Sequence, residues 1–212
     1  MSSTEKLNYK GYKMSHKSII ELYVNSFLKH GDSDKSVFFP KGRQYTRFES
    51  LIPKDLSVAS LLDYGCGLGK LVSYLKDTDS KIRYSGVDIV SHFIKHNSKK
   101  FSDVDFYQIN SYQDISKKYD LIVASGTFNI ISEDYLKHKT YVFDCLTHLF
   151  NQANKCLAVD FMHTQVDFQQ KGAFHLDHLE LIQFIEKNLT TKYILRRNYL
   201  PYEYSIQIFK EE

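Results

Sequence analysis

The sequence predicts an α/β fold with a mostly parallel sheet that is covered by helices on both faces. Three observations lead to this fold class. From about residue 58 to residue 188, short apolar segments alternate with amphipathic ones, which is the pattern of strands joined by helices in a parallel sheet. A glycine-rich turn, GCGLG, follows the first apolar segment. The last two apolar segments are joined too closely for a crossover helix, so they must pair antiparallel.

Two helices are expected ahead of the sheet. In segment 15–31, the apolar side chains fall on one face of a helix that Ser15 can cap at its start and Gly31 can end. A second, shorter helix is predicted over 43–52. Together these helices suggest a small N-terminal layer in front of the α/β core.

The core elements then follow in regular order. Asp177 opens the last helix, with Glu180 at the spacing of a capping box, and the turn at Pro201 separates the two final strands. In chain order we expect a strand at 58–64, a helix at 70–77, a strand at 82–89, a helix from Ser91 to about residue 99, strands at 104–110 and 119–128, a helix from Ser132 to about residue 152, a strand at 155–162, a helix at 177–188, and strands at 192–198 and 204–210.

Size and composition are those of one globular domain. The 212 residues are 42% hydrophobic and 25% charged with a net charge of +3, which is too mild to favour nucleic acid as the main partner. No apolar run approaches the ~20 residues of a membrane span. Three cysteines without metal or disulfide spacing, and a polar N-terminus, predict a cytoplasmic protein. We expect one domain over 1–212, with a helical cap or lid over 1–55 and the core over 56–212.

The turn after the first strand combines an acid with three glycines, in the pattern Asp63-x-Gly65-x-Gly67-x-Gly69. The dinucleotide fingerprint would require a glycine where this chain has Lys70. A carboxylate beside a diphosphate would repel it, whereas the same carboxylate can orient an ammonium group. The glycines allow the backbone to approach a ligand closely. The turn is therefore expected to bind a cationic ligand without phosphate.

A second acid, Asp88, ends the second predicted strand, nineteen residues past Gly69. A carboxylate there can accept hydrogen bonds from both hydroxyls of a ribose, as it does in dinucleotide enzymes. Asp88 by itself does not discriminate between ligands, but it agrees in position with the turn.

The glycine turn resembles motif I of class I S-adenosylmethionine-dependent methyltransferases, and the resemblance covers roughly residues 40–210. It implies a three-layer, doubly wound, Rossmann-like sheet of seven strands, mostly parallel with an antiparallel C-terminal hairpin, plus N-terminal helices. It also implies S-adenosylmethionine as cofactor and S-adenosylhomocysteine as product. Arg47 is expected to pair with the carboxylate of the methionyl group. Asn110 stands where the family often has Asp. The implied cofactor-binding residues are Gln44, Arg47, Asp63, Gly65, Cys66, Gly67, Gly69, Asp88, Ile89, Asn110, Ser111, Ser125 and Gly126.

Candidates for chemistry lie after the fourth and fifth strands. A sulfonium methyl group is already activated, so positioning and exclusion of water supply most of the catalysis. A hydroxyl acceptor would benefit from a general base, for which histidine is suited, whereas an ionised oxygen needs none. The alternative interpretations are that these histidines are ordinary surface residues and that Phe128 is an aromatic residue of the core. No spacing suggests a metal site. We expect catalytic roles for Asp160, His163 and His178, and substrate contacts for Phe128, Asn129 and His175.

The acceptor is expected to be an oxygen of a small polar metabolite. The fourth strand ends in SGTF, without the (D/N)PP(Y/F) segment that methyltransferases of base nitrogens and glutamine amides carry. The segments 159–168 and 193–210 look like those of small bacterial methyltransferases of surface-polysaccharide and natural-product pathways. A sugar, a sugar nucleotide or a phosphoryl-type group of a surface glycan is therefore the leading hypothesis.

Several alternatives remain open at this stage. They are N-methylation of a small-molecule amine, an NAD-dependent oxidoreductase, and a binding protein that keeps the cofactor pocket without turnover. The expected partner is a small molecule, with no nucleic acid and no membrane, and the chain is expected to be a monomer or homodimer. Tyr9 and Tyr12 belong either to a lid over the cofactor or to a solvated tail.

Overall fold

A computed structural model describes residues 15–39, 42–132 and 134–211, so Tyr9 and Tyr12 lie outside the described residues. The helices are α1 (His16–His30), α2 (Gln44–Leu51), α3 (Lys70–Asp77), α4 (Ser91–Lys100), α5 (Tyr135–Gln152) and α6 (His178–Asn188), with short 3₁₀ helices η1 (Asp34–Val37) and η2 (Tyr112–Asp114). The strands are β1 (Ser60–Tyr64), β2 (Arg83–Asp88), β3 (Asp105–Gln108), β4 (Tyr119–Ala124), β5 (Ala153–His163), β6 (His175–Leu176), β7 (Tyr193–Arg196) and β8 (Glu203–Phe209).

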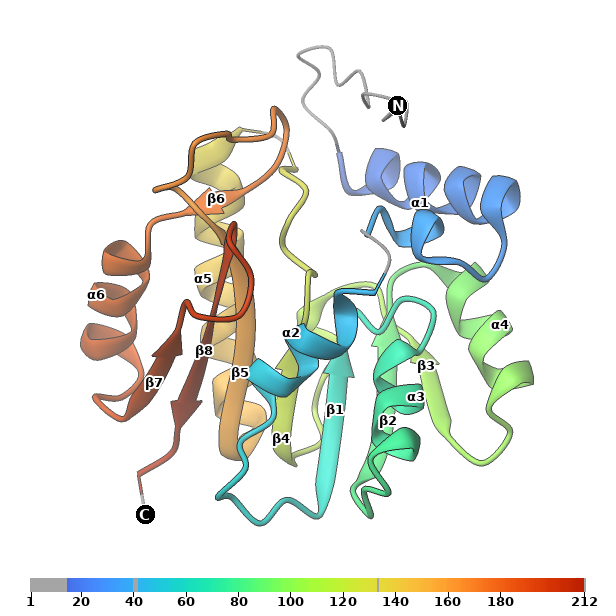
Figure 1. Cartoon of the computed structure of the whole chain (residues 1–212), viewed down its shortest axis with the longest axis horizontal. Helices are drawn as coiled ribbons and strands as arrows, with labels where there is room; N and C mark the ends of the chain where they lie inside the picture. Colours follow the sequence, from blue (N-terminus) through green and yellow to red (C-terminus); the bar gives the residue numbers. More distant parts are fainter. Residues whose placement is uncertain (1–14, 40–41, 133, 212) are drawn as a thin grey trace.

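The strands form one sheet in the order β3-β2-β1-β4-β5-β8-β7, and the short β6 pairs with β5 off this path. Strands β1 to β5 run parallel along this order, whereas β8 is antiparallel to both β5 and β7. The strand order reverses between β1 and β4, which is the place where doubly wound sheets bind ligands. The predicted α/β class, with its mostly parallel sheet and C-terminal hairpin, is confirmed. In Figure 1 the parallel strands end at the edge below α1.

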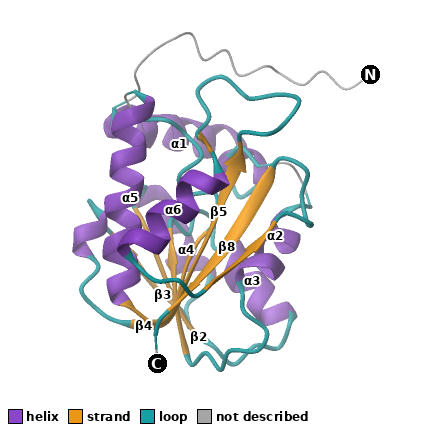
Figure 2. Ribbon diagram, turned by 90° about the vertical axis from the view of Figure 1, so that its left-hand side faces the viewer, coloured by secondary structure: helices purple, strands orange, loops and turns teal. Residues whose placement is uncertain are grey.

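Helices cover the sheet on both faces, and each face has its own apolar core. One cluster joins the sheet to α2, α3 and α4 through residues such as Leu51, Leu71 and Ile94. The other joins it to α5 and α6 through residues such as Leu146 and Ile185. Figure 2 shows the sheet on edge, with α5 and α6 on one side and α2 and α3 on the other. The central strand β1 is buried along its whole length, as expected for a strand covered on both faces.

The predicted helix termini are mostly confirmed. The Ser15 hydroxyl caps α1 at the amide of residue 18, and Gly31 follows its last turn with a positive φ of 62°. The Asp177 carboxylate accepts a hydrogen bond from the amide of Leu179 and caps α6. The prediction that a helix begins at Ser132 is wrong, because α5 begins at Tyr135 with Asp134 as its cap. Ser132 instead places its hydroxyl 3.0 Å from Nδ1 of His138.

A second difference concerns the segment that follows β5. The sequence predicted no strand or helix between residues 162 and 177, but His175–Leu176 forms β6 and pairs in parallel with Met162 and His163 at the end of β5. Two residues are too few to show a strand pattern in sequence, so only the pairing partner reveals it. This short strand places His175 on the sheet.

The N-terminal layer packs against the core through α1. Its side chains Tyr23, Val24 and Phe27 contact a small cluster that includes Val90 and Phe93 at the start of α4. The rings of Phe27 and Phe93 meet edge to face, with centroids 5.7 Å apart. This packing holds α1 across the edge at which the parallel strands end (Figure 1). Within the described ranges, no helix has the length and apolar character that crossing a membrane requires.

Candidate active site

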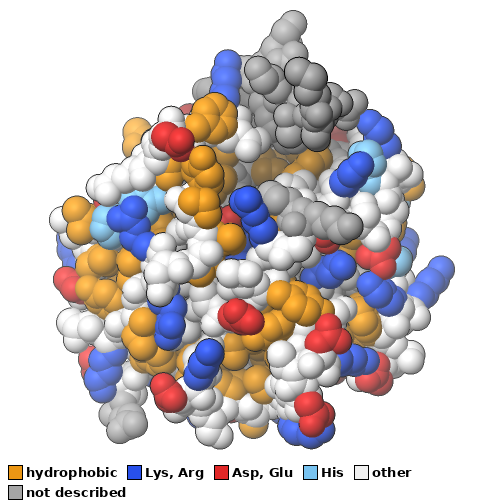
Figure 3. All heavy atoms as spheres, in the orientation of Figure 1, with side chains coloured by type: hydrophobic (Ala, Val, Ile, Leu, Met, Phe, Trp, Pro, Cys, Tyr) orange, Lys and Arg blue, Asp and Glu red, His pale blue; other side chains and the backbone are white. Residues whose placement is uncertain are grey.

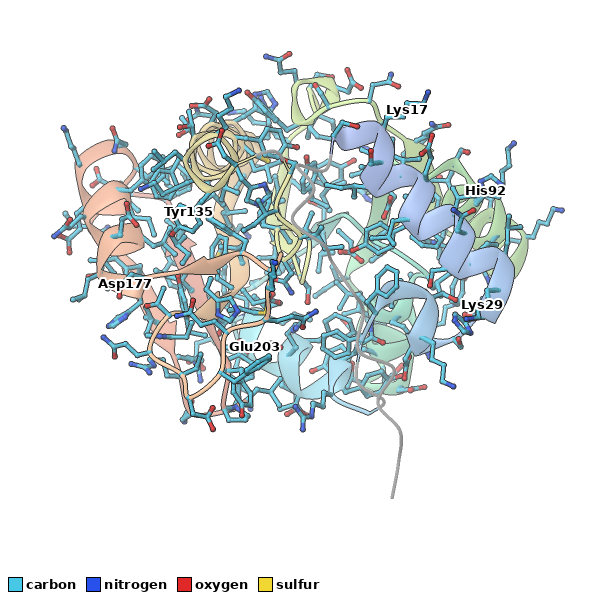
Figure 4. The ribbon with its side chains drawn as sticks, turned by 90° about the horizontal axis from the view of Figure 1, so that it is seen from above. Lys17, Lys29, His92, Tyr135, Asp177 and Glu203 are labelled. Carbon is cyan, nitrogen blue, oxygen red and sulfur yellow. The ribbon has the colours of Figure 1, made fainter. Side chains whose placement is uncertain are left out.

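A cavity of about 480 Å³ opens at the carboxyl ends of the parallel strands. Its walls come from α1, η1, α2, the glycine turn, and the segments that follow β2, β4 and β5. Figure 4 looks down on this edge: α1, with Lys17 and Lys29, covers one side, Tyr135 and Asp177 lie on the other, and Glu203 lies between them. The cavity is of a size that takes a small ligand.

The glycine turn is held in a shape that only glycine adopts easily. Gly65, Gly67 and Gly69 have φ values of 78°, 51° and 68°, in the left-handed region that side chains disfavour. A β-carbon on Gly65 would lie 2.6 Å from Oγ1 of Thr127, whose hydroxyl donates to the carbonyl of Tyr64. The turn therefore packs tightly against the segment after β4 and leaves its other side to the cavity.

Asp63 ends β1 beneath this turn and is almost fully buried. Its Oδ2 accepts a hydrogen bond from the hydroxyl of Tyr84 over 2.8 Å. Burial raises the pKa of Asp63 to about 7; the bond from Tyr84 opposes this rise, and the charge of Asp88 adds to it. A buried carboxylate whose closest donor is a neutral hydroxyl is stabilised by a cationic ligand. Asp63 thus fits an ammonium group and would repel a diphosphate.

Asp88 ends β2 and holds two backbone amides. Oδ2 accepts from the amide of Gly67 over 2.9 Å, and Oδ1 accepts from the amide of Val90 over 2.8 Å. Burial raises its pKa to about 6, and the amide bonds lower it. Each carboxylate oxygen has a further lone pair for a hydroxyl. Asp88 therefore both fixes the turn and fits the ribose contact that the sequence predicts.

The guanidinium of Arg47, in α2, lies beside two carboxylates, those of Glu203 and Asp160. Its Nε and Nη2 donate to Oε2 and Oε1 of Glu203 over 2.8 and 2.5 Å, and Nε lies 3.4 Å from Oδ2 of Asp160. The guanidinium also lies 4.0 Å from the ring centroid of Phe39. The sequence predicted that Arg47 binds a ligand carboxylate, but the structure uses two of its three nitrogens in this protein ion pair. Nη1 remains beside Gly126, 2.6 Å from the position of a β-carbon there.

Asp160 is held from three directions and is 1% exposed. Its oxygens accept from the hydroxyl of Ser125 and the amide of Gly126, each over 2.8 Å. Burial raises the pKa of the Asp160 carboxyl, and the neighbouring Arg47 guanidinium opposes that rise. These contacts fix the turn after β4, so Asp160 positions Ser125 and Gly126 and does not itself line the cavity.

The part of the cavity beyond β4 and β5 is lined by aromatic and uncharged polar groups. His138 is fixed there by two contacts: Nε2 lies 3.0 Å from the carbonyl of Phe128, and Nδ1 accepts from the amide of Ser132. Oδ1 of Asn129 and Nε2 of His175 are buried and have no hydrogen-bond partner among the described residues. Both residues line the cavity, so two polar atoms that lack a partner in the described part of the protein lie in its wall.

The structure brings most of the predicted site residues to one cavity. Those that line it are Gln44, Arg47, Asp63, Gly65, Cys66, Gly67, Asp88, Ile89, Ser125, Gly126, Phe128, Asn129 and His175. Those that do not line it are Gly69, Asn110, Ser111, Asp160, His163 and His178.

The residues outside the cavity have structural tasks. The amide of Asn110 and the hydroxyl of Ser111 take part in the capping of η2 with Asp114, and Ile109 lines the cavity in their place. Gly69 begins α3 against Phe101. A residue's nearness to a strand end in sequence therefore did not decide which way its side chain points.

His163 and His178, both predicted as catalytic, pair with each other instead. Nδ1 of His163 accepts from the amide of Gln165 over 2.7 Å, so Nε2 is the atom that donates to Nδ1 of His178 over 3.0 Å. Burial lowers the pKa of His163, and the charge of Arg197 acts in the same direction. The pair joins β5 to α6, and neither histidine is among the described residues that line the cavity.

Sequence reasoning missed several lining residues, including Thr127, His138, Tyr141, Met162 and Glu203. Thr127 stands next to the predicted Ser125 and Gly126, so proximity could have indicated it. His138 lies inside a helix and Glu203 inside a strand, 156 positions from Arg47. No local signal marks such residues, because the fold alone brings them to the site.

Residues 62–158 match a family model described as a methyltransferase domain. The matched segment runs from β1 to β5 and contains the glycine turn, Asp63 and Asp88. The family match therefore coincides with the elements that carry the cofactor half of the cavity.

Similar proteins extend this result. Rv1506c of Mycobacterium tuberculosis, whose name gives it as a candidate methyltransferase, is 22% identical over 157 residues, covering 71% of this chain and 93% of that protein. The plantazolicin methyltransferase BpumL, solved with S-adenosylhomocysteine, superposes with a TM-score of 0.61 at 15% identity over 92% of this chain and 99% of that chain. Magnesium protoporphyrin IX methyltransferase of Synechocystis PCC 6803, with bound S-adenosylmethionine, gives 0.55 at 13% identity over 79% and 76%. The two solved structures share the fold of this chain, and the name of Rv1506c agrees with the enzyme class that the resemblance of the glycine turn implies.

Proposed function

We propose that this S-adenosylmethionine-dependent methyltransferase transfers the methyl group to an oxygen of a small polar metabolite. The candidate acceptors are a sugar, a sugar nucleotide or a phosphoryl-type group destined for a cell-surface glycan. One observation carries the proposal: a single cavity joins two chemically different halves. One half offers buried carboxylates and a glycine turn, and the other offers aromatic walls with uncharged polar atoms.

The cofactor half supplies binding and orientation. Asp63 faces the charge of an amino-acid ammonium group, and Asp88 faces ribose hydroxyls while it holds the turn in shape. When bound, S-adenosylmethionine supplies a methyl group that its sulfonium has already activated. The protein then needs to hold the acceptor in line with that methyl group and exclude water.

The acceptor half fits a small polar molecule. Arg47, which also lines the cavity, is paired with Glu203 and Asp160, so this cation is largely neutralised within the protein. Oδ1 of Asn129 and Nε2 of His175 can each accept a hydrogen bond, as a hydroxyl group would donate. The face shown in Figure 3 mixes Lys and Arg with Asp and Glu, unlike the basic stripe of a nucleic-acid-binding surface.

We also propose that the chain acts as one domain, with residues 1–55 as a cap on the core at 56–212. The described part of the cap supports this, because Ile19 and Tyr23 of α1 line the cavity. In this arrangement α1 shields one side of the cofactor from solvent.

A small-molecule amine is the second candidate acceptor. The observation in its favour is Glu203, whose carboxylate lines the cavity and is shared with Arg47. A protonated amine would be attracted by this excess of carboxylate over guanidinium, and its deprotonated form would then be the nucleophile.

Calorimetry and a transfer assay together test the proposed function. We expect S-adenosylhomocysteine to bind and NAD not to bind, since Asp63 would repel a diphosphate. With tritiated S-adenosylmethionine and a panel of sugars, sugar nucleotides and amines, we expect label on oxygen, located by mass spectrometry of the product. Binding of NAD in place of S-adenosylhomocysteine, or label found only on nitrogen, would contradict the proposal.

A further inference from the structure

His175 lines the acceptor half of the cavity and carries a buried ring nitrogen that has no partner in the described part of the chain. The side chain lines the cavity, the residue is 6% exposed, and Nε2 has no hydrogen-bond partner among the described residues. Buried polar atoms in folded proteins are nearly always paired, and an exception calls for a functional explanation. A ligand group that donates to Nε2 would complete the missing bond.

The backbone around His175 is fixed on both sides. β6 pairs with β5 through Met162, and on the preceding residue the amide of Phe174 donates to the carbonyl of Asn129 over 2.9 Å. The hydroxyl of Tyr135 donates to the carbonyl of His175 over 3.2 Å. The ring is thus carried by the sheet, which positions a functional group more accurately than a free loop does.

The hydrogen bond at the other ring nitrogen sets the protonation pattern. Nδ1 of His175 lies 2.7 Å from the carbonyl oxygen of His163. A carbonyl can only accept, so Nδ1 carries the hydrogen. In the neutral ring, Nε2 must then hold the lone pair. The ring nitrogen that has no partner within the described ranges is therefore the basic one.

In the three neighbouring histidines, the ring lone pair already accepts a hydrogen bond within the protein. In His138, Nε2 donates to the carbonyl of Phe128 while Nδ1 accepts from Ser132. His163 and His178 are bonded to each other. Among these four, only His175 combines a lone pair with a place on the cavity wall.

We propose that His175 is the general base of the reaction and that the acceptor oxygen arrives as a neutral hydroxyl. The inference rests on the proposed function and narrows it, since an ionised phosphoryl oxygen would need no base. The hydroxyl proton passes to Nε2, the oxygen forms its new bond to the methyl carbon, and the carbon–sulfur bond breaks with its electron pair on sulfur. The imidazolium later releases its proton to water. Asn129, on the segment that pairs with residue 174, accepts a second donor of the same substrate.

The tautomer of His175 tests the proposal without any acceptor. In protein labelled with ¹⁵N-histidine, with S-adenosylhomocysteine bound and at about pH 8, nitrogen chemical shifts report which ring atom carries hydrogen. We expect hydrogen on Nδ1 and a lone pair on Nε2 for His175. His138 and His148 are internal controls of opposite type, because their Nε2 atoms contact the carbonyls of Phe128 and Ile115. Hydrogen on Nε2 of His175 would overturn the proposal.

A variant gives the second test. His175→Asn retains an N–H group near the position of Nδ1 but lacks the base, and His148→Gln is the matched control outside the cavity. With tritiated S-adenosylmethionine and phenol, catechol, methyl glucoside or uridine as probes, we expect His175→Asn to lower turnover of any methylated probe by about 10²- to 10⁴-fold. Affinity for S-adenosylhomocysteine should stay within about twofold of the parent protein.

The outcomes separate this inference from the proposed function. If His175→Asn methylates a hydroxyl probe as fast as the parent protein does, His175 is not the general base. The proposed methyltransferase function would still stand. Failure of the parent protein to bind S-adenosylhomocysteine would remove the proposed function itself. The tautomer measurement decides whether Nε2 can serve as the base even if none of these probes is methylated.

Discussion

Two buried carboxylates at the same edge of the sheet, Asp63 in β1 and Asp160 in β5, have opposite surroundings. Both are nearly inaccessible, at 4% and 1% exposed. Asp63 accepts from the neutral hydroxyl of Tyr84 and lines the cavity. Asp160 accepts from Ser125 and Gly126, lies beside the guanidinium of Arg47, and does not line the cavity.

This difference shows that burial alone does not identify a binding carboxylate. Asp160 has its counter-charge in the protein, so it can hold the structure of the turn after β4. Asp63 lacks one close by, so its charge is left for a ligand to balance. In sequence both are simply acids near the end of an apolar strand. Four changes, from the largest expected effect to the smallest, test whether the two sites differ in this way.

The largest effect is expected from Arg47→Met. This change leaves the buried Asp160 and the half-buried Glu203 without their cation, and removing one partner of a buried ion pair typically costs about 3–5 kcal/mol. Urea denaturation should show that loss in the free energy of unfolding. Arg83→Met, at the exposed start of β2, is the matched control and should change stability by less than about 0.5 kcal/mol. A loss confined to cofactor affinity, with full stability, would show that Arg47 is primarily a ligand contact.

Asp88→Ala should have the next largest effect, on cofactor binding. The ribose hydroxyls lose a charged acceptor, and such a hydrogen bond contributes roughly 1.5–3 kcal/mol. Calorimetry with S-adenosylhomocysteine should therefore show an affinity lowered about 10- to 150-fold. Asp105→Ala, an exposed carboxylate on the neighbouring β3, serves as the control. Equal affinities in the two variants would contradict the assignment of Asp88.

A pH dependence of about tenfold should follow from Asp63. Its pKa is raised to about 7 by burial, so below pH 7 the carboxyl carries a proton that must leave before it can pair with an ammonium group. Affinity for S-adenosylhomocysteine should therefore fall as pH falls through 7, by up to about tenfold per pH unit for one proton.

The isosteric variant Asp63→Asn separates this effect from others. Its residue 63 cannot titrate, so its affinity should be lower at neutral pH, and any fall that remains near pH 6 belongs to Asp88, whose pKa is raised to about 6. A parent protein whose affinity does not change over this range would show that Asp63 is already ionised and balanced within the protein, as Asp160 is.

Ser125→Ala should have the smallest effect. It removes one of the donors to Asp160, but Gly126 and Arg47 remain, so we expect a loss of about 1 kcal/mol in unfolding free energy. Thermal unfolding should detect it, with Ser57→Ala at an exposed position as the control. If Ser125→Ala were as damaging as Arg47→Met, the Asp160 site would depend on its hydroxyl donor and not on its cation.

The sequence predicted most of the fold because the signals are local. Strands such as β1 and β4 are mostly apolar, and the caps at Ser15 and Asp177 use side chains within a few positions of the amides they bind. The start of α5 was misplaced because Ser132 and Asp134 are both good caps, and only the contact of Ser132 with His138 decides between them. The two-residue β6 carries no pattern of its own.

For the site, the same distinction holds. Motif I could be identified because Asp63 and its three glycines lie close together in the sequence. The charge of Asp63 and the backbone freedom of the glycines each explain why that residue type stands there. The acceptor half could not be derived in the same way, since His138, His175 and Glu203 come from a helix and two strands far apart in the chain. The orientation of His163 away from the cavity depends on its partner His178, which no spacing rule reveals.

The short strand β6 has a consequence for how such an enzyme changes over evolution. It anchors one end of the segment 164–174 to the sheet, and β5 anchors the other, so substitutions in between reshape one wall of the cavity while the register of the sheet and the glycine turn stay as they are. Phe168, which is 66% exposed, and Gln170 both lie in this segment and line the cavity. Substitutions in this segment can therefore change which acceptor binds while the residues that bind the methyl donor stay unchanged.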